Sequence, residues 1–589
     1  MEVAEHFYAD DPSRGPVDGK TTLEGADYFF LGNGLIQAAV QVTPAEGATP
    51  VGILVMDPES LGPKKAALTF DGQSGLLRTA MTLVDGAASH RARGSSVRAR
   101  WLPRSAVPRV EVVWRGGGFR VTEVFFCPDS GSARLLRRVT VSRSGPARSR
   151  ILLRSGVRGR EVETGFDLRA GGTRSVVFEY RLVRRDGRAS VGVRIVDDPG
   201  DPPDAASYWA DTAACRFSDP LLDRVFAAAK FQLRAAVSSS GRLDGSVWQY
   251  NLEWVRDQAF IAMALVMSGQ AALARTMLRR LLSDFVSPEG ATMDSSRFRP
   301  WPESEFDQNG ILLFALGAYL DWTGDRGLVE EHWKRIELVA DFPLRPEFRH
   351  GPSGLLANRR EFWERHGAHG ILKGMELAHQ LYVAMGLESA GRMAGILGRK
   401  KKAAAWTAAG AALREAMLRS KDHSLVESGV LIKRRGVDGR VQREIRPEPG
   451  SSLPGKTPLF EPGRHRLNPD TSSVLPVAWE FIDPGGRLAL KTLASMGTIW
   501  NQRWTGGGYG RYDVTSEPDS PGPWPFASLF VARAAVEAGD GRTARRVLDW
   551  MARVPGSRAC SWFEFYGPRP VPPYPQVGII PWTWAELIF

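Results

Sequence analysis

The stretch DDPGDPPD, residues 197–204, marks the point where the pattern of the chain changes. Before it, short runs of β-branched and aromatic residues alternate with Gly, Pro, Asp and Ser, which is typical of strands and turns. After it, apolar residues recur at helical spacing. A chain of 589 residues is also too long for one ordinary hydrophobic core. We therefore predict a β-rich domain followed by a helical domain.

The N-terminal part is predicted to form a large antiparallel β-sandwich. Predicted strands are 28–31, 35–42, 51–56, 96–101, 109–114, 120–127 and 133–142. We assign residues 1–200 to this domain and residues 201–217 to a linker, because the linker region is rich in Pro, Asp and Gly.

From residue 218 onward the pattern is helical. Ser218-Asp219-Pro220 supplies a cap and first turn, and an apolar stripe comes directly after it. Further helices are predicted at about 256–268, 271–285, 309–322, 327–340, 369–386, 388–397, 402–418, 472–481, 485–496, 523–538, 541–553 and 580–588. Paired helices can close into an (α/α)6 barrel over residues 218–589, although a helical solenoid would give a similar pattern. The predicted fold class is α+β multidomain, with the sandwich before the barrel.

The net charge of +12 invites a nucleic-acid interpretation, since basic surfaces bind phosphates with release of counterions. However, the arginines are spread over the whole chain and no nucleic-acid-binding motif accompanies them. The dense run Arg399–Lys402 is typical of a solvated helix end. No run of about eighteen apolar residues is present, so no membrane span is expected. The acidic start, MEVAEHFYADD, lacks the features of a signal peptide, so we expect a cytoplasmic protein.

The sequence pattern indicates neither a metal site nor a cofactor. Cys127, Cys215 and Cys560 are scattered and odd in number, which fits neither a zinc site nor a disulfide framework. His366 and His369 are close enough in sequence to share a metal ion, but no third ligand accompanies them. Nothing in the pattern indicates an oligomeric state.

Tryptophans and acidic residues cluster in the predicted loops, at residues 248–257, 361–367, 561–566 and 580–586. Indole rings can stack on the C–H faces of sugars, and adjacent Arg and Asp side chains can hold neighbouring hydroxyls. An aromatic wall raises the pKa of a carboxyl group, as a general acid at neutral pH requires. Two such carboxyls can hydrolyse a glycosidic bond. Taken alone, each acid also fits a helix cap or a surface position.

The helical region resembles glycoside hydrolase family 15, the glucoamylase-type enzymes, over roughly residues 210–589. The family carries a Y-x-x-x-W-x-R-D motif, which Tyr250, Trp254, Arg256 and Asp257 match. The resemblance implies that all four residues line the substrate site. It also implies that Arg256 and Asp257 hold the hydroxyls of the terminal sugar.

The family's general acid is the first Glu of a W-E-E motif that is often followed by G-x-H. Trp363-Glu364-Arg365, with Gly367 and His369, matches this motif except that Arg365 replaces the second Glu. The resemblance therefore implies that Glu364 is the general acid and that Trp363 and Arg365 lie in the substrate site.

Three further segments keep the family's order. Gly510-Arg511-Tyr512, Glu517 and Gly522-Pro523-Trp524 resemble a substrate-contact segment, which implicates Arg511 and Trp524. Glu564-Phe565, with Pro581-Trp582-Thr583-Trp584 after it, resembles the segment of the general base, with Phe565 in place of Gln. This implies that Glu564 is the base and that Trp582 contacts substrate. Phe306–Leu316 resembles a family loop and helix, with Asp307 as a further substrate-site candidate.

These resemblances predict an inverting, exo-acting glycoside hydrolase that releases a terminal sugar, such as glucose from an α-glucoside, from an oligosaccharide or glycoside. Neither nucleic acid nor membrane is expected as a partner. One alternative is an inverting phosphorylase of the same architecture, which uses phosphate in place of the base. Another is a non-catalytic sugar-binding homologue. A carboxylate at Glu564 favours hydrolysis.

Overall fold

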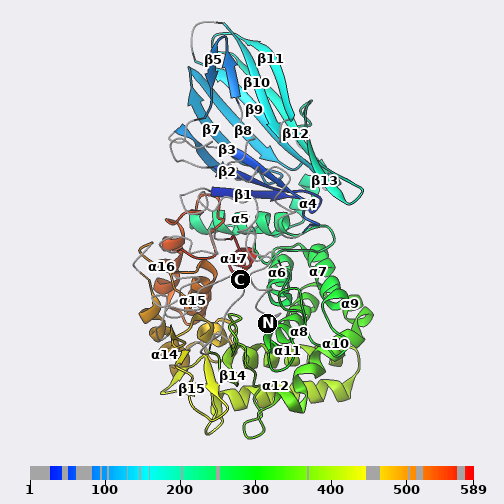
Figure 1. Ribbon diagram of the computed structural model, residues 1–589, viewed down its shortest axis with the longest axis vertical. Helices are drawn as coiled ribbons and strands as arrows, with labels where there is room; N and C mark the ends of the chain where they lie inside the picture. Colours follow the sequence, from blue (N-terminus) through cyan, green and yellow to red (C-terminus); the bar gives the residue numbers. More distant parts are fainter. Residues whose placement is uncertain are drawn as a thin grey trace.

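The computed structural model describes residues 27–42, 51–60, 82–92, 96–102, 105–128, 131–144, 148–157, 160–200, 203–246, 252–367, 370–445, 465–501, 505–511, 522–566 and 578–589. Antiparallel sheets form the N-terminal part, and helices dominate the C-terminal part (Figure 1). The prediction of an α+β chain with its strands at the N-terminus is confirmed.

The N-terminal strands form three sheets. Their bounds are β1 Asp27–Gly32, β2 Gln37–Val42, β3 Val51–Met56, β4 Thr82–Asp85, β5 Ala88–His90, β6 Arg98–Trp101, β7 Val110–Gly116, β8 Phe119–Phe126, β9 Arg134–Arg143, β10 Ser149–Val157, β11 Arg160–Leu168, β12 Thr173–Arg185 and β13 Arg188–Val196. The sheet orders are β1-β2-β3, β11-β10-β4-β5 and β13-β12-β9-β8-β7-β6. Each of the strand pairs is antiparallel.

The two larger sheets share a buried polar group. Arg137 on β9 is fully buried and pairs with Glu123 on β8, with 2.5 Å between Nη2 and Oε2. The same guanidinium donates to Ser155 on β10 and to Tyr180 on β12, at 3.3 Å each. A buried arginine is tolerated because these oxygens satisfy its charge and its N–H groups.

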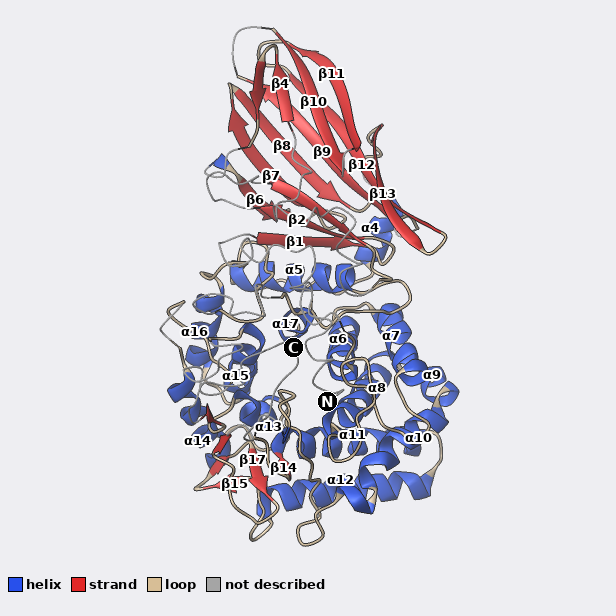
Figure 2. Ribbon diagram, in the orientation of Figure 1, coloured by secondary structure: helices blue, strands red, loops and turns tan. Residues whose placement is uncertain are grey.

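The second half of the chain is mainly helical (Figure 2). Its α-helices are α4 Pro203–Ala210, α5 Pro220–Ala236, α6 Val255–Met267, α7 Ala271–Asp284, α8 Phe306–Thr323, α9 Arg326–Glu331, α10 Trp333–Asp341, α11 Leu377–Ile396, α12 Lys400–Arg419, α13 Leu475–Ala478, α14 Arg487–Ser495, α15 Pro525–Glu537, α16 Gly541–Met551 and α17 Pro581–Glu586. No helix in the described ranges is long and apolar enough to cross a membrane.

Short elements complete this half. The 3-10 helices are η3 Phe342–Leu344, η4 Pro346–Phe348, η7 Thr471–Val474 and η8 Met496–Ile499. The short strands are β14 Gly374–Glu376, β15 Val426–Glu427, β16 Val430–Leu431, β17 Arg434–Gly436, β18 Glu444–Ile445 and β19 His465–Arg466. They pair as β14-β17, β15-β16 and β18-β19.

The most buried helices follow one another in a cyclic order of contacts. Helix α6 contacts α8, α8 contacts α11, and α11 contacts η7 and so leads to α13. Helix α13 contacts α15, α15 contacts α17, and α17 returns to α6. Six further helices contact members of this series: α7 contacts α6, α10 contacts α8, α12 contacts α11, α14 contacts η7, α16 contacts α15, and α5 contacts α17.

Several predicted helices differ from the structure. The helices predicted at 369–386 and 388–397 are wrong as separate elements, because β14 is followed by one continuous helix, α11. The helix predicted at 327–340 is divided at His332 into α9 and α10, and the one at 472–481 shortens to η7 and α13. The range predicted as a linker, 201–217, contains α4.

Gly386 lies inside α11 and has a packing role. A Cβ atom at Gly386 would lie 2.5 Å from the Gly310 carbonyl oxygen, and one at Gly310 would lie 2.1 Å from the Tyr382 carbonyl oxygen. Helices α8 and α11 therefore cross in backbone contact, which only residues without a side chain permit.

Helix α5 joins the sheets to the helical part. The Phe30 amide of β1 donates to the Gln232 side-chain oxygen at 3.3 Å, and the Gln232 amide nitrogen donates to the Cys560 carbonyl at 2.9 Å. The Trp101 indole of β6 donates to the Ala559 carbonyl at 2.9 Å. The sheets thus hold the segment that leads to Glu564.

We expect Gly310→Ala to lower the free energy of unfolding by about 1–3 kcal/mol, because the added methyl group overpacks the α8–α11 crossing. Urea denaturation measures this change. The matched control is Gly395→Ala, since a Cβ at Gly395 meets no atom within 4 Å. Alanine should be neutral there, or stabilising by up to about 1 kcal/mol. Equal effects at the two positions would contradict the backbone contact.

Candidate active site

The candidate site residues lie mainly where the buried helices begin. Arg256 and Asp257 are in the first turn of α6, and Asp307 is in the first turn of α8. Trp582 is in the first turn of α17, and Trp524 directly precedes α15. The starts of these helices therefore build one end of the helical part.

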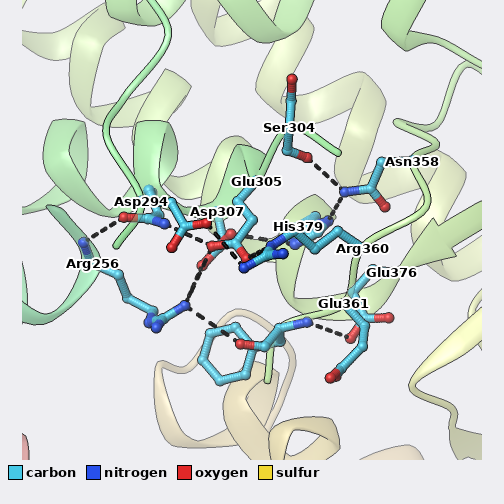
Figure 3. Close-up of polar contacts among 12 residues, drawn as sticks. Arg256, Asp294, Ser304, Glu305, Asp307, Asn358, Arg360, Glu361, Glu376 and His379 are labelled. Atoms are coloured by element: carbon cyan, nitrogen blue, oxygen red, sulfur yellow. Dashed lines mark hydrogen bonds and ion pairs between the residues drawn. The ribbon is translucent and has the colours of Figure 1, made fainter. Parts of the chain in front are cut away.

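The Arg256 guanidinium lies within 4 Å of four carboxylates. Figure 3 shows it with two of these acids, Glu305 and Asp307. The Arg256 Nη2 lies 2.5 Å from Oε1 of Glu364, and its Nε lies 3.3 Å from Oδ2 of Asp257. Its Nη1 lies 3.6 Å from Oε2 of Glu305 and 3.9 Å from Oδ2 of Asp307. Arg256 is 5% exposed. The structure thus brings Arg256, Asp257 and Glu364 together, as well as Asp307.

Aromatic rings lie against the same guanidinium. Its carbon is 5.6 Å from the ring centroid of Phe362 and 5.6 Å from that of Trp582. Trp582 stacks on Phe260 and on Phe526, with 5.0 Å between the centroids in each pair. Arg256 therefore lies between carboxylates and the aromatic core of the helices, in surroundings that strengthen its electrostatic contacts.

Glu364 belongs to a compact group of acids. Carboxylate oxygens of Asp294, Glu305 and Glu364 lie within 4.8 Å of one another. Arg360 is fully buried and contacts all three, at 3.0 Å to Asp294, 3.6 Å to Glu364, and through its Nε to Glu305. Arg299 adds a contact of 2.6 Å to Asp294. These arginines already supply the opposite charge, so we assign no metal ion to the group.

The environment separates the pKa values of these acids. Burial and the Asp294 carboxylate together raise the pKa of Glu364 above its ordinary value. Burial alone would raise the pKa of Asp294, but Arg360 and Arg299 lower it to about 2. Burial raises the pKa of Asp257 to about 7. Burial likewise raises the pKa of Glu305 well above its ordinary value. The protons of this group therefore reside on Glu305 and Glu364 in preference to Asp294.

A second set of candidates is linked through ring contacts. The Arg511 guanidinium carbon lies 4.1 Å from the ring centroid of Trp524 and 5.7 Å from that of Trp363. Trp524 stacks on Phe565, with 5.4 Å between the centroids. Phe565 directly follows Glu564, which is 4% exposed. Since Trp363 directly precedes Glu364, these contacts connect the segments that carry the two glutamates.

The remaining candidates have different surroundings. The Asp307 side chain is fully buried and lies 3.3 Å from Nε2 of His379. It contacts Arg256 from this buried position. A Cβ atom at Gly245 would lie 2.6 Å from the Trp254 ring, so this ring packs against backbone. The Arg365 amide donates to Glu361 at 3.0 Å. Tyr250, Tyr512, Glu517 and His369 lie outside the described residues.

Sequence reasoning missed the residues that surround Glu364. Asp294, Glu305 and Arg360 are not among the predicted candidates, although all three belong to the charged group around its carboxyl. The sequence carries one signal that could have identified part of this group. Three acids stand at 303, 305 and 307, directly before an apolar helical stretch. Acids at the start of an apolar helix are poorly explained as solvent-exposed residues.

The arrangement can be compared with known structures. A crystal structure of a bacterial glucoamylase complexed with acarbose matches 97% of this chain and 94% of its own, with a TM-score of 0.58 and 11% sequence identity. The fold is that of a glucoamylase. The resemblance to the glucoamylase-type family is thereby confirmed for the fold, including the N-terminal sheets that precede the helices.

A curated relative shares a shorter region. Trehalase 1 of Sulfolobus acidocaldarius is 26% identical over 152 residues, which are 21% of this chain and 27% of the trehalase. The match thus spans about a quarter of that relative's length. No protein-family model matches the chain.

We expect Arg360→Met to lower the free energy of unfolding by about 3–5 kcal/mol, because it leaves buried carboxylates without their cation. Chemical denaturation measures the change. Arg392→Met is the matched control, since Arg392 pairs with Asp321 at 2.7 Å on the surface, with both side chains about half exposed. Loss of that pair should cost about 0–1 kcal/mol. A loss of stability at Arg360 no larger than the control's would refute the ionic role of this residue.

Proposed function

We propose that this protein is an inverting, exo-acting glycoside hydrolase that releases glucose from the end of an α-glucoside. Glu364 is the general acid and Glu564 the general base in this proposal. The observation that carries it is the contact of 2.5 Å between Arg256 and Glu364, with Asp257 on the same guanidinium. The glucoamylase fold and the short trehalase match both support hydrolysis of a glycosidic bond.

Glu364 has the properties of a proton donor. It is 7% exposed, and its raised pKa favours the protonated form. A general acid works best when its pKa lies near the operating pH, which burial and a neighbouring carboxylate achieve here. Arg256 fixes the position of the carboxyl by binding one of its oxygens.

Asp257 has the properties of a sugar ligand. Its Oδ2 is buried and accepts no hydrogen bond from the residues that the structure describes, since the contact of 3.3 Å to Arg256 is an ion pair only. A sugar hydroxyl would donate to this oxygen, while neighbouring oxygens of the sugar would accept from Arg256. We propose that both residues bind the terminal sugar, and that Asp307 positions Arg256 from behind.

The assignment of Glu564 as base rests on its place in the family motif, its burial, and the ring contacts of Phe565. A base must hold water on the face of the sugar opposite the acid, which in inverting enzymes requires a separation of about 6.5–9.5 Å between the carboxyls. The other candidates, Tyr250, Trp254, Trp363, Arg365, Arg511, Trp524 and Trp582, are proposed to shape the substrate site.

We also infer that the cyclic order of helix contacts is an (α/α)6 barrel over residues 218–589. The preceding 200 residues are proposed to be a β-sandwich domain, joined through residues 201–217. Helix starts at one end of such a barrel give a common site for residues that are distant in sequence. An oligosaccharide is the proposed partner.

We expect Glu364→Gln and Glu564→Gln each to lower kcat on maltose, isomaltose or trehalose by about 10²–10⁴-fold, because each removes a proton-transfer group. Sugar binding should persist, as measured by calorimetry with acarbose. Proton NMR of the fresh product should show β-glucose. Release of α-glucose would contradict the inverting mechanism. Release of glucose phosphate only when phosphate is present would indicate a phosphorylase, and absence of any product a binding protein.

The pH dependence tests the role of Asp294. Its carboxylate raises the pKa of Glu364, so the protonated acid persists to higher pH, and activity falls as pH rises through that pKa. We expect Asp294→Asn to lower the pKa of Glu364 and to move the basic limb of the kcat/KM profile to lower pH. A basic limb that stays in place, or moves to higher pH, would argue against this interaction.

A further inference from the structure

The backbone of Glu364 is unusual. Its φ angle is +71°, in the left-handed region that residues with a side chain rarely adopt. This conformation costs about 1–2 kcal/mol for an L-residue, so surrounding contacts must hold it. Glu364 is also the residue whose carboxyl contacts Arg256. The contacts that hold its turn therefore also bear on the position of this carboxyl.

The Glu361 carboxylate binds the backbone amides of the two residues on either side of Glu364. Its Oε2 accepts from the Trp363 amide and its Oε1 from the Arg365 amide, at 3.0 Å each. The backbone closes the same turn: the Glu364 amide donates to the Glu361 carbonyl at 2.7 Å, and the Glu361 amide to the Arg365 carbonyl at 2.9 Å. Amides that converge on an anion in this way form a stable concave site around a left-handed residue.

Lys433 neutralises that carboxylate from a distant part of the chain. Its Nζ lies 2.5 Å from Oε2 of Glu361 and 2.9 Å from Oδ2 of Asp470. A third acid, Glu376, lies at 3.6 Å. All four side chains are fully buried. Burial alone would lower the pKa of Lys433, but Asp470 and Glu361 raise it above its ordinary value, so the ammonium stays charged.

Asp470 extends the cluster to the indole of Trp363. The indole N–H lies 3.1 Å from Oδ1 and 2.9 Å from Oδ2 of Asp470. Lys433 Nζ lies 5.3 Å from the centroid of the same ring. Asp470 also caps η7 by accepting from the Ser472 amide at 2.7 Å. One cluster thus fixes both the backbone at Glu364 and the side chain that precedes it.

We propose that Glu361 and Lys433 are positioning residues that hold the left-handed turn from which Glu364 reaches Arg256, and that Asp470 fixes Trp363 in the same arrangement. None of them exchanges a proton with substrate. This inference rests on the proposed role of Glu364 as general acid. A general acid must lie within hydrogen-bond reach of the leaving oxygen, so a displaced turn impairs proton donation before it impairs binding.

The test compares two substrates that differ in their need for an acid. Hydrolysis of maltose requires protonation of the departing oxygen, whereas α-glucosyl fluoride loses fluoride without that proton while water attacks the anomeric carbon. We expect Glu361→Gln and Lys433→Met to lower kcat on maltose by about 10–100-fold, part of the effect of general acid catalysis. On α-glucosyl fluoride, kcat should change by less than about threefold, since a displaced acid costs little when no proton is needed. KM should change little.

Lys230→Met is the matched control, because Lys230 is another buried lysine and donates to Thr212 and to the Ala213 carbonyl at the start of the helical part. It should lower the melting temperature without any preference between substrates. Equal losses on both substrates in Glu361→Gln and Lys433→Met, or no loss on either, would overturn the proposal. If Lys433→Met does not fold, because Asp470 and Glu376 lose their cation, Glu361→Gln alone provides the same comparison.

Glu364→Gln, measured in parallel, separates this inference from the proposed function. A selective loss on maltose in Glu364→Gln but not in Glu361→Gln would reject the positioning role alone. Equal losses on both substrates in Glu364→Gln would reject Glu364 as the acid and with it the basis of the inference.

Discussion

The burial of the Arg256 guanidinium constrains the whole helical part. A cation this deep in a protein is stable only when opposite charges and hydrogen-bond acceptors surround it. Glu364 and Glu305 reach it from two different loops, and Asp307 reaches it from the start of α8. The aromatic ring of Trp582 lies against it from α17. Three helix starts and the turn that carries Glu364 are therefore fixed relative to one another by a single side chain.

Two buried ionic clusters meet at that turn and differ in what they bind. On one side, Arg256 and Arg360 bind the Glu364 carboxyl itself. On the other side, Glu361 binds backbone amides around it, and Lys433 binds the Glu361 carboxylate. Each cluster pairs its buried acids with its own cations, Arg256 and Arg360 in one and Lys433 in the other. Buried charges are then tolerated without direct competition for the carboxyl that is proposed to donate the proton.

The sequence predicts local structure well where a pattern repeats over several residues. The change from strands to helices near residue 200 and the position of Arg256 and Asp257 at the start of a helix both follow from such patterns. Residues 369–397 are predicted as two helices, whereas Gly386 lies within the single helix α11. A glycine at a helix crossing and a glycine at a helix end look alike in sequence. Both leave the same local signature, and only the partner helix distinguishes them.

The surroundings of Glu364 could not be predicted in the same way, because they depend on pairs that are distant in sequence. Lys433 stands in the run Leu431-Ile-Lys-Arg-Arg435, which resembles an ordinary solvated basic segment. Its burial follows from acids at 361, 376 and 470 that approach it only in the folded chain. Family motifs locate residues that contact substrate, whereas supporting residues of this kind leave no comparable pattern.

The hydrogen bonds of Gln232 have a consequence for how such chains can diversify. One side chain on α5 binds the first strand and also the segment that leads to Glu564, and Trp101 of β6 binds the same segment. The sheets are therefore a structural support of the catalytic half and cannot act as an independent appendage. Recombination that exchanges the sheets between homologues would have to exchange residues 559–561 as well, so the two halves are expected to be inherited as one unit.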